Sequence, residues 1–353
     1  MLSPFFRGLI QGLRLPSISV VVGACAIAAG VFLLGAAGLT ERRVAAAPPG
    51  AWMLDSRDDF GRLNSFVFNT LRVPSTNATV YLLGASDLRE MLATGGELNR
   101  LLREQKRDST EVVSLCADGF LLEERAAVLD RLKPSSRGAV VLGINLTQLC
   151  RPTADLARIS EHYRLGVRSP VFDEEAALAG TAMPSPTGLF FFDNRLFFLR
   201  RLGCLLRRGP PPAYVEHRNH GAMEAAGDPW QFRRIQHFSV EEFRRRTGVI
   251  SRMAKRNREA GGPPLVLLEI PSLDYLQPGL GGRSHANELS LYREAIREFA
   301  AREGLAYLDP QAAGGLTRAS YRDFAHVGDD PSRTRFSAEF IRQLIPVLSP
   351  VHP

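Results

Sequence analysis

Short apolar runs alternate with longer amphipathic stretches along most of the chain beyond residue 77. Five of these runs are rich in Val, Leu and Ile and predict β-strands. They lie at residues 79–83, 111–115, 138–143, 265–270 and 305–308. Patterns with helical periodicity lie at residues 87–107, 121–132, 287–302 and 337–348. This alternation predicts an α/β fold, a three-layer α/β/α sandwich around a five-stranded parallel sheet, in which ligands bind beyond the carboxyl ends of the strands.

A single long apolar segment, residues 15–40, carries no charge. About 20 apolar residues cross a bilayer as a helix, and a buried core helix would show a polar stripe. Arg7 and Arg14 precede the segment, which favours a cytoplasmic amino terminus. We therefore expect a cytoplasmic segment at 1–14, a single-pass anchor in the bacterial inner membrane at 15–40, and an extracytoplasmic or periplasmic remainder. A signal peptide cleaved near the alanines at 45–47 is the alternative.

The remainder divides into a linker at residues 41–76 and a domain at residues 77–350. Between the third and fourth predicted strands this domain carries an insertion at residues 151–262. The insertion contains a proline-rich stretch, an aromatic patch and a predicted helix at residues 240–258. We interpret it as a lid for a substrate or a partner.

Cysteine and histidine usage gives little sign of a bound metal. An extracytoplasmic location permits disulfides, and Cys116, Cys150 and Cys204 lie outside the apolar segment. A Cys116–Cys150 bridge and buried free thiols are both compatible with the predicted strands. His217 and His220 lie in an Arg- and Pro-rich stretch, and two histidines at this spacing are a weak pattern, so we predict no metal site and no cofactor.

The composition is that of a globular protein, with 45% hydrophobic and 23% charged residues among 353, which excludes wholesale disorder and a multi-span membrane protein. The net charge of +7 is unevenly placed. Residues 195–258 hold 14 Arg and one Lys against five acidic residues, so this segment alone carries +10. Its basic surface suits an acidic polysaccharide, anionic lipid headgroups or a membrane-protein partner, and it is also compatible with a solvated face that binds nothing. Nucleic acid is not expected outside the cytoplasm.

Four places in the sequence carry candidate chemistry. Ser86 ends the first predicted strand before a helix, where a serine acts either as a helix cap or as a nucleophile. Asp323 and His326 are spaced so that the carboxylate reaches Nδ1 of the imidazole and leaves Nε2 as a general base. Asn145 and Gly119 follow the third and second strands, where they can donate hydrogen bonds to an oxyanion or simply form turns.

The order of these residues resembles that of the SGNH (GDSL-like) hydrolase superfamily, over residues 77–149 and 263–348. The resemblance implies that Ser86 is the nucleophile, His326 the base and Asp323 the residue that orients it. It also implies that Asn145 and Gly119 are the oxyanion donors.

Two motifs depart from the common family pattern. Gly84-Ala85-Ser86-Asp87 stands where the family has G-D-S, and no Asp follows Asn145. Such drift is typical of the membrane-anchored branch of the superfamily that handles acyl groups on cell-surface polysaccharides.

The resemblance implies a membrane-anchored, extracytoplasmic O-acyl transferase or esterase, with acetyl as the expected acyl group. It would act on a cell-envelope polysaccharide through a Ser-His-Asp acyl-enzyme mechanism, with a multi-span membrane O-acyltransferase donating the acyl group in the transferase case. Transfer and hydrolysis use the same residues and differ only in the acceptor. The alternative function is a non-catalytic glycan-binding or assembly scaffold that partners a multi-span acyltransferase.

Overall fold

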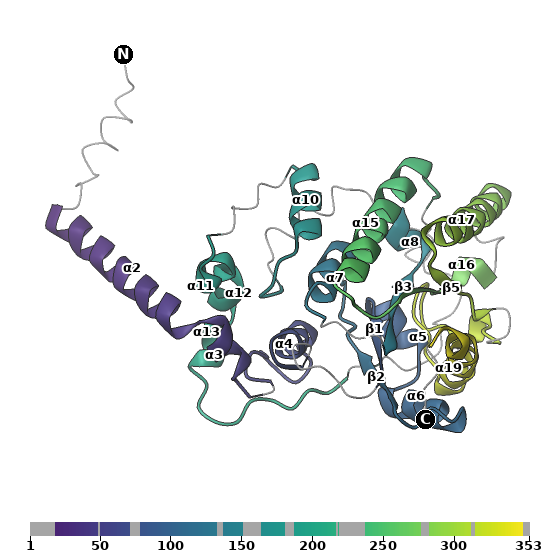
Figure 1. Ribbon diagram of the computed structural model, residues 1–353, viewed down its shortest axis with the longest axis horizontal. Helices are drawn as coiled ribbons and strands as arrows, with labels where there is room; N and C mark the ends of the chain where they lie inside the picture. The colour runs from purple at the N-terminus through teal and green to yellow at the C-terminus, as the bar shows by residue number, and fades with distance from the viewer. Residues whose placement is uncertain are drawn as a thin grey trace, which may run out of the picture. The chain divides into compact units, whose positions relative to one another are not determined.

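The computed structural model describes residues 18–48, 50–70, 78–132, 137–150, 164–180, 187–216, 218, 237–276, 282–311 and 315–348. The chain forms two compact units (Figure 1). One comprises Met1–Ala47 with Ser185–Arg195, and the other comprises Pro48–Pro184 with Leu196–Pro353.

The smaller unit contains the apolar helix α2 (Ile18–Gly38), which has 21 residues and a mean hydropathy of 2.4. It is the one helix among the described residues that is long and apolar enough to cross a membrane, and a signal sequence has the same character. Residues 1–17 lie outside the described part. Phe32 of α2 contacts Phe191 and Phe192 of the short helix α11 (Phe190–Asp193), with ring centroids 6.3 and 3.5 Å apart. Helix α3 (Glu41–Ala45) follows α2, capped by Thr40.

The larger unit is built on a five-stranded sheet, as the alternation of strands and helices predicts. The strands are β1 (Ala78–Leu83), β2 (Thr110–Ser114), β3 (Gly138–Ile144), β4 (Leu265–Glu269) and β5 (Ala306–Leu308). Their order is β2-β1-β3-β4-β5, and every neighbouring pair is parallel. The order reverses between β1 and β3, and at such a point the loops at the carboxyl ends diverge and leave a crevice. The predicted α/β fold is confirmed.

Helices cover both faces of the sheet (Figure 1). The described helices include α5 (Ser86–Met91), α6 (Gly95–Glu104), α7 (Leu122–Leu129), α10 (Pro170–Leu178), α15 (Val240–Glu259), α17 (Gly282–Glu303) and α19 (Asp330–Leu344). They also include α4 (Asp59–Ser65), η1 (Phe66–Thr70), α8 (Leu146–Leu149), α12 (Arg195–Arg200), α13 (Leu202–Leu205), α16 (Leu273–Leu276), η3 (Arg318–Ser320) and η4 (Ile345–Val347). Helices α5, α6 and α19 pack together on one side of the sheet, and α7, α8 and α15 pack together on the other.

Several helix boundaries differ from the prediction, and two of the differences are explained by a capping residue. The stretch expected as one helix at 87–107 is interrupted after Met91, because Thr94 caps a new helix by accepting a hydrogen bond from the Glu97 amide at 3.3 Å. The last helix begins at Asp330, earlier than expected, since the Asp329 carboxylate caps its first turn.

Parts of the insertion belong to the helical layer itself. Helices α10 and α15 both pack on α7, and α15 buries Val249, Ile250 and Met253 in the interior. Helices α10 and α15 thus form part of a sandwich layer, whereas α11 belongs to the smaller unit. Residues 151–163, 181–186, 217 and 219–236 lie outside the described part of the chain.

Arginines of the insertion pair with the acidic residues of α7. Arg246 forms a buried ion pair with Glu123, and Arg164 Nη2 lies 2.5 Å from Glu124. At the carboxyl end of the helix, Arg256 Nη2 lies 3.0 Å from the Asp130 carboxylate. Part of the basic excess of the insertion is therefore directed inward.

All four cysteines lie in the described part of the chain, and none forms a disulfide. Cys116 and Cys150 are both buried, and their burial raises the pKa of each thiol to about 11. The bridge between them that the sequence left open is not formed.

Removing Arg246 tests the packing of the insertion on α7. Arg246→Met leaves the Glu123 carboxylate buried without its partner, which should lower the free energy of unfolding by about 3–5 kcal/mol. The double variant Arg246→Met/Glu123→Leu removes both charges and should recover at least half of that loss. Urea unfolding of the full chain in detergent measures both. Equal destabilisation of the single and the double variant would contradict the role of the pair.

Candidate active site

Ser86 begins helix α5, directly beyond the carboxyl end of β1. Ala85 occupies the N-cap position, so the Ser86 hydroxyl does not cap the helix. The turn is tight: a Cβ at Gly84 would lie 2.5 Å from Leu88, and one at Gly143 would lie 3.0 Å from the same side chain. These two glycines let α5 approach the ends of β1 and β3, and the serine hydroxyl is left available to a partner.

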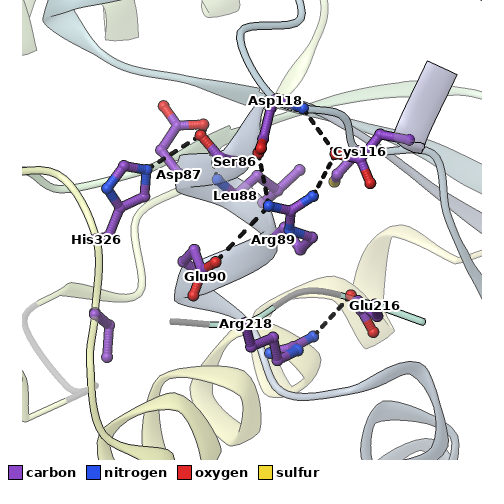
Figure 2. A network of polar contacts seen from close by, with 12 residues as sticks. Ser86, Asp87, Leu88, Arg89, Glu90, Cys116, Asp118, Glu216, Arg218 and His326 are labelled. Atoms are coloured by element: carbon purple, nitrogen blue, oxygen red, sulfur yellow. Dashed lines mark hydrogen bonds and ion pairs between the residues drawn. The ribbon is translucent and has the colours of Figure 1, made fainter. Parts of the chain in front are cut away.

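That partner is His326. The Ser86 Oγ lies 3.1 Å from Nε2 of His326 (Figure 2). Nδ1 of His326 lies 2.9 Å from each carboxylate oxygen of Asp323. The three residues predicted as nucleophile, base and orienting acid are brought into one continuous chain of hydrogen bonds, with the spacing expected of an activated nucleophile.

The loop that carries Asp323 and His326 is closed by its own backbone. Tyr321 and Val327 form an antiparallel bridge across its base, and the Tyr321 hydroxyl donates to the Pro271 carbonyl at 2.6 Å. Asp323 accepts a hydrogen bond from the His326 amide at 3.0 Å. The contacts within the loop hold the carboxylate against the imidazole, and the bond to Pro271 ties the loop to the segment after β4.

Electrostatics keep the acid ionised and the imidazole basic. Burial lowers the pKa of His326, but the hydrogen bond and charge of Asp323, with smaller contributions from Asp87 and Glu90, outweigh it and raise that pKa above its usual value. Burial raises the pKa of Asp323, yet the hydrogen bond and charge of His326 and the amides of Ala325 and His326 lower it to about 2. Asp323 is therefore ionised throughout the neutral range, where it stabilises an imidazolium.

The two predicted oxyanion donors are placed differently. Asn145 follows β3, and its Nδ2 donates to Asp87 at 2.6 Å while its Oδ1 caps α8. One hydrogen of that amide is thus committed to Asp87, and only the second can serve an oxyanion. Gly119 lies in an exposed turn after β2 with φ of 61°, and its carbonyl accepts from Arg164 at 2.9 Å. No hydrogen bond among the described residues joins Gly119 to Ser86 or His326.

Several residues that shape the site escaped the sequence prediction, and Asp87 is the first. Its carboxylate accepts hydrogen bonds from the side chains of Asn145 and Gln148 at 2.6 and 2.7 Å, and it is almost fully buried. It ties the segment after β1 to the segment after β3. The only signal in the sequence is the position of Asp87, directly after the candidate nucleophile.

Arg89 organises the opposite side of α5. Its guanidinium lies 2.6 Å from Asp118 (Figure 2). It also lies 2.6 Å from Asp59, which accepts a hydrogen bond from Tyr214 at 2.6 Å. Burial lowers the pKa of Arg89, but the charges of Asp59 and Asp118 outweigh it and raise that pKa above its ordinary value. This network anchors α4 and the turn after β2 to the helix that carries Ser86.

Arg333 connects the two halves of the hydrogen-bonded chain. Its Nη2 lies 3.1 Å from the buried Glu90 carboxylate and donates to the Val327 carbonyl at 2.6 Å. Its Nε donates to the Glu90 carbonyl at 2.9 Å. Since Glu90 is in the helix of Ser86 and Val327 follows His326, one guanidinium fixes the positions of Ser86 and His326 relative to each other.

Ser86, His326 and Asp323 together have the arrangement for attack on an acyl carbonyl. Among the described residues, the group of side chains suited to a metal ion lies elsewhere, at His237, His285 and Glu288. His217 and His220 lie outside the described residues.

No protein-family model and no curated protein matches the sequence. Solved structures of ester hydrolases align with most of the chain. A lipase/acylhydrolase from Enterococcus faecalis is 10% identical, with a TM-score of 0.36 over 78% of this chain and 100% of its own. A carbohydrate acetylesterase family member from Sinorhizobium meliloti is 13% identical, with a TM-score of 0.32 over 76% and 96%. A lipase from a goat rumen metagenome is 10% identical, with a TM-score of 0.38 over 75% and 97%. At these values the likenesses do not assign an activity to this chain.

Proposed function

We propose that the protein is an acyl-transferring serine enzyme, an esterase or an O-acyltransferase. The observation that carries the proposal is the continuous hydrogen-bonded chain from Ser86 through His326 to Asp323. A serine hydroxyl is a weak nucleophile unless a base accepts its proton, and a base is effective only when it is held in the right tautomer. The geometry supports both conditions.

In the proposed mechanism the Ser86 Oγ attacks the acyl carbonyl while His326 Nε2 takes its proton. The Ser86 amide and the second N–H of Asn145 would stabilise the oxyanion, with Gly119 as a further donor after a movement of its turn. Collapse of the tetrahedral intermediate releases the alcohol, which takes the proton back from His326. Water or a sugar hydroxyl then removes the acyl group from Ser86 by the same steps in reverse.

We further propose that the enzyme is anchored in the bacterial inner membrane and acts outside the cytoplasm on O-acetyl groups of a cell-envelope polysaccharide. The length and composition of α2 support an anchor. The departures around Ser86 and Asn145 support the polysaccharide-modifying branch of the family that the sequence resembles. In the transferase case a multi-span membrane O-acyltransferase would supply the acyl group.

A second candidate function is a non-catalytic scaffold that binds glycan or recruits a multi-span acyltransferase. The observation in its favour is the hydrogen bond from the Asn145 amide to Asp87. This bond places a carboxylate near the expected oxyanion and uses one of the two N–H groups that Asn145 could offer to the oxyanion. A negative charge at that point disfavours the developing oxyanion. Reactivity of Ser86 separates the two functions.

Ser86→Ala tests catalysis directly. The variant lacks the nucleophile but keeps its backbone, so kcat for hydrolysis of an activated acetyl ester should fall by about 10³–10⁶-fold with an unchanged unfolding transition. A fluorophosphonate probe should label the wild-type protein at Ser86 and leave the variant unlabelled. Ser290→Ala, at an exposed serine of α17, is the matched control and should keep full activity and labelling. Wild-type protein that neither cleaves the ester nor reacts with the probe would favour the scaffold.

The pH dependence of the site tests the role of Asp323. Only neutral His326 accepts the serine proton, so acylation should increase with pH through a pKa that lies above the unperturbed value of about 6.5. Asp323→Asn removes the carboxylate that raises this pKa, so the titration midpoint of His326 should move to lower pH, and kcat should fall by about 10⁴-fold. NMR titration of the imidazole, assigned by its loss in His326→Gln, measures the midpoint. A midpoint that stays the same or moves upward in Asp323→Asn would overturn the assignment.

A further inference from the structure

His285 is a buried histidine outside the proposed catalytic chain, and one of its ring nitrogens has no hydrogen-bond partner among the described residues. Its side chain is 0% exposed, and Nε2 lies 2.8 Å from the Asp274 carboxylate. The other nitrogen, Nδ1, is buried and unsatisfied. A buried polar atom without a partner costs free energy, so its retention calls for a ligand that the protein side chains do not provide.

The Asp274 carboxylate determines which nitrogen carries the lone pair. A carboxylate accepts a hydrogen bond from N–H, so Nε2 is protonated and Nδ1 of the neutral ring presents its lone pair. Ser272 in turn donates to the other oxygen of Asp274 and holds the carboxylate in place. A carboxylate behind a histidine in this way is the usual support for a metal-ligating imidazole.

Two further ligand side chains converge on that lone pair. Glu288 is one turn along α17 from His285, and its Oε2 lies 3.8 Å from His285 Nδ1. His237 lies just before α15, and its Nδ1 is 2.9 Å from Glu288 Oε2. The ligand atoms of the three residues all lie within 4.8 Å of one another. In a tetrahedral site with bonds of about 2.1 Å, ligand atoms are roughly 3.4 Å apart. The His237 side chain is 73% exposed and has room to make the small adjustment required.

We propose that His237, His285 and Glu288 form a binding site for a first-row divalent cation, with Zn²⁺ as the preferred ion. Two imidazoles and one carboxylate suit Zn²⁺ and leave the fourth position to a water molecule. Asp274 is a positioning residue in this site, because it acts on the ion through His285.

The site joins three segments that are distant in the sequence. His285 and Glu288 belong to α17, His237 leads into α15, and Asp274 belongs to the short helix α16 that follows β4. Helix α16 also contacts the loop of His326, since the Leu273 amide donates to the Phe324 carbonyl at 2.9 Å. A bound ion would therefore stabilise the segment of Leu273 and Asp274 that contacts the His326 loop, without contacting the reacting atoms. This inference stands independently of the proposed enzymatic activity.

The test is Zn²⁺ titration of the full chain, purified in detergent without a polyhistidine tag and stripped with a chelator. Competition against a chromogenic chelator should show one tight site per chain, and X-ray absorption should show nitrogen or oxygen ligands at about 2.0–2.1 Å without sulfur. His237→Ala and Glu288→Gln should each weaken binding by at least about tenfold, and Asp274→Asn by about 10–100-fold. His237 is exposed, so its variant should fold normally.

Two controls make the result specific. Glu294→Gln alters an exposed carboxylate on another face of α17 and should leave Zn²⁺ affinity unchanged. Ser86→Ala should also bind one Zn²⁺, which separates this site from the proposed catalysis. Absence of a stoichiometric site in the wild-type protein would overturn the proposal. Zn²⁺ affinity in His237→Ala and Glu288→Gln equal to that of the wild-type protein would also overturn it, because the ion would then lie elsewhere on the chain.

Discussion

The guanidinium of Arg333 is the constraint on which the arrangement of the site depends. It is buried between the Glu90 carboxylate and the Val327 carbonyl, and these groups belong to the helix of Ser86 and the loop of His326. A buried pair of this kind adds little net stability, because both charges must be desolvated. It does limit how the groups can be arranged, since any other packing would leave a charge unpaired. The separation of 3.1 Å between serine and histidine is maintained by an interaction outside the hydrogen-bonded chain.

The sheet determines where the residues of the site lie, and two glycines allow the helix of Ser86 to lie close to the strands. The reversal of strand order between β1 and β3 brings their carboxyl ends to one crevice. Gly84 and Gly143 let Leu88 and its helix lie close to both strands. Asp87 then bonds to Asn145 across the gap. Ser86 is thus held by the close packing of its helix on the strands and by the hydrogen bond between Asp87 and Asn145.

The strands could be predicted from the sequence because each is a short apolar run. Ser86, Asp323 and His326 could be singled out from their positions relative to the predicted strands and helices and from the order that resembles a known family. Apolar runs mark buried strands, and an Asp three residues before a His lies within one short loop. The partners of Arg333 and Arg89 could not be predicted, since charged residues at helical spacing are usually solvated and Glu90 is far from Arg333 in sequence. The break before Thr94 did have a signal, a Thr followed three residues later by Glu. His237 and His285 have no characteristic spacing, and only the fold brings them together.

The pairing of insertion arginines with α7 bears on how this protein can be shortened. Each of the three carboxylates of this region, Glu123, Glu124 and Asp130, forms an ion pair with an arginine of the insertion at residues 151–262. A truncated chain that kept only the sheet and its immediate helices would expose a row of like charges on α7, next to the strands it covers. The insertion thus supplies the countercharge for these three carboxylates, and a shortened chain would have to retain it or neutralise them.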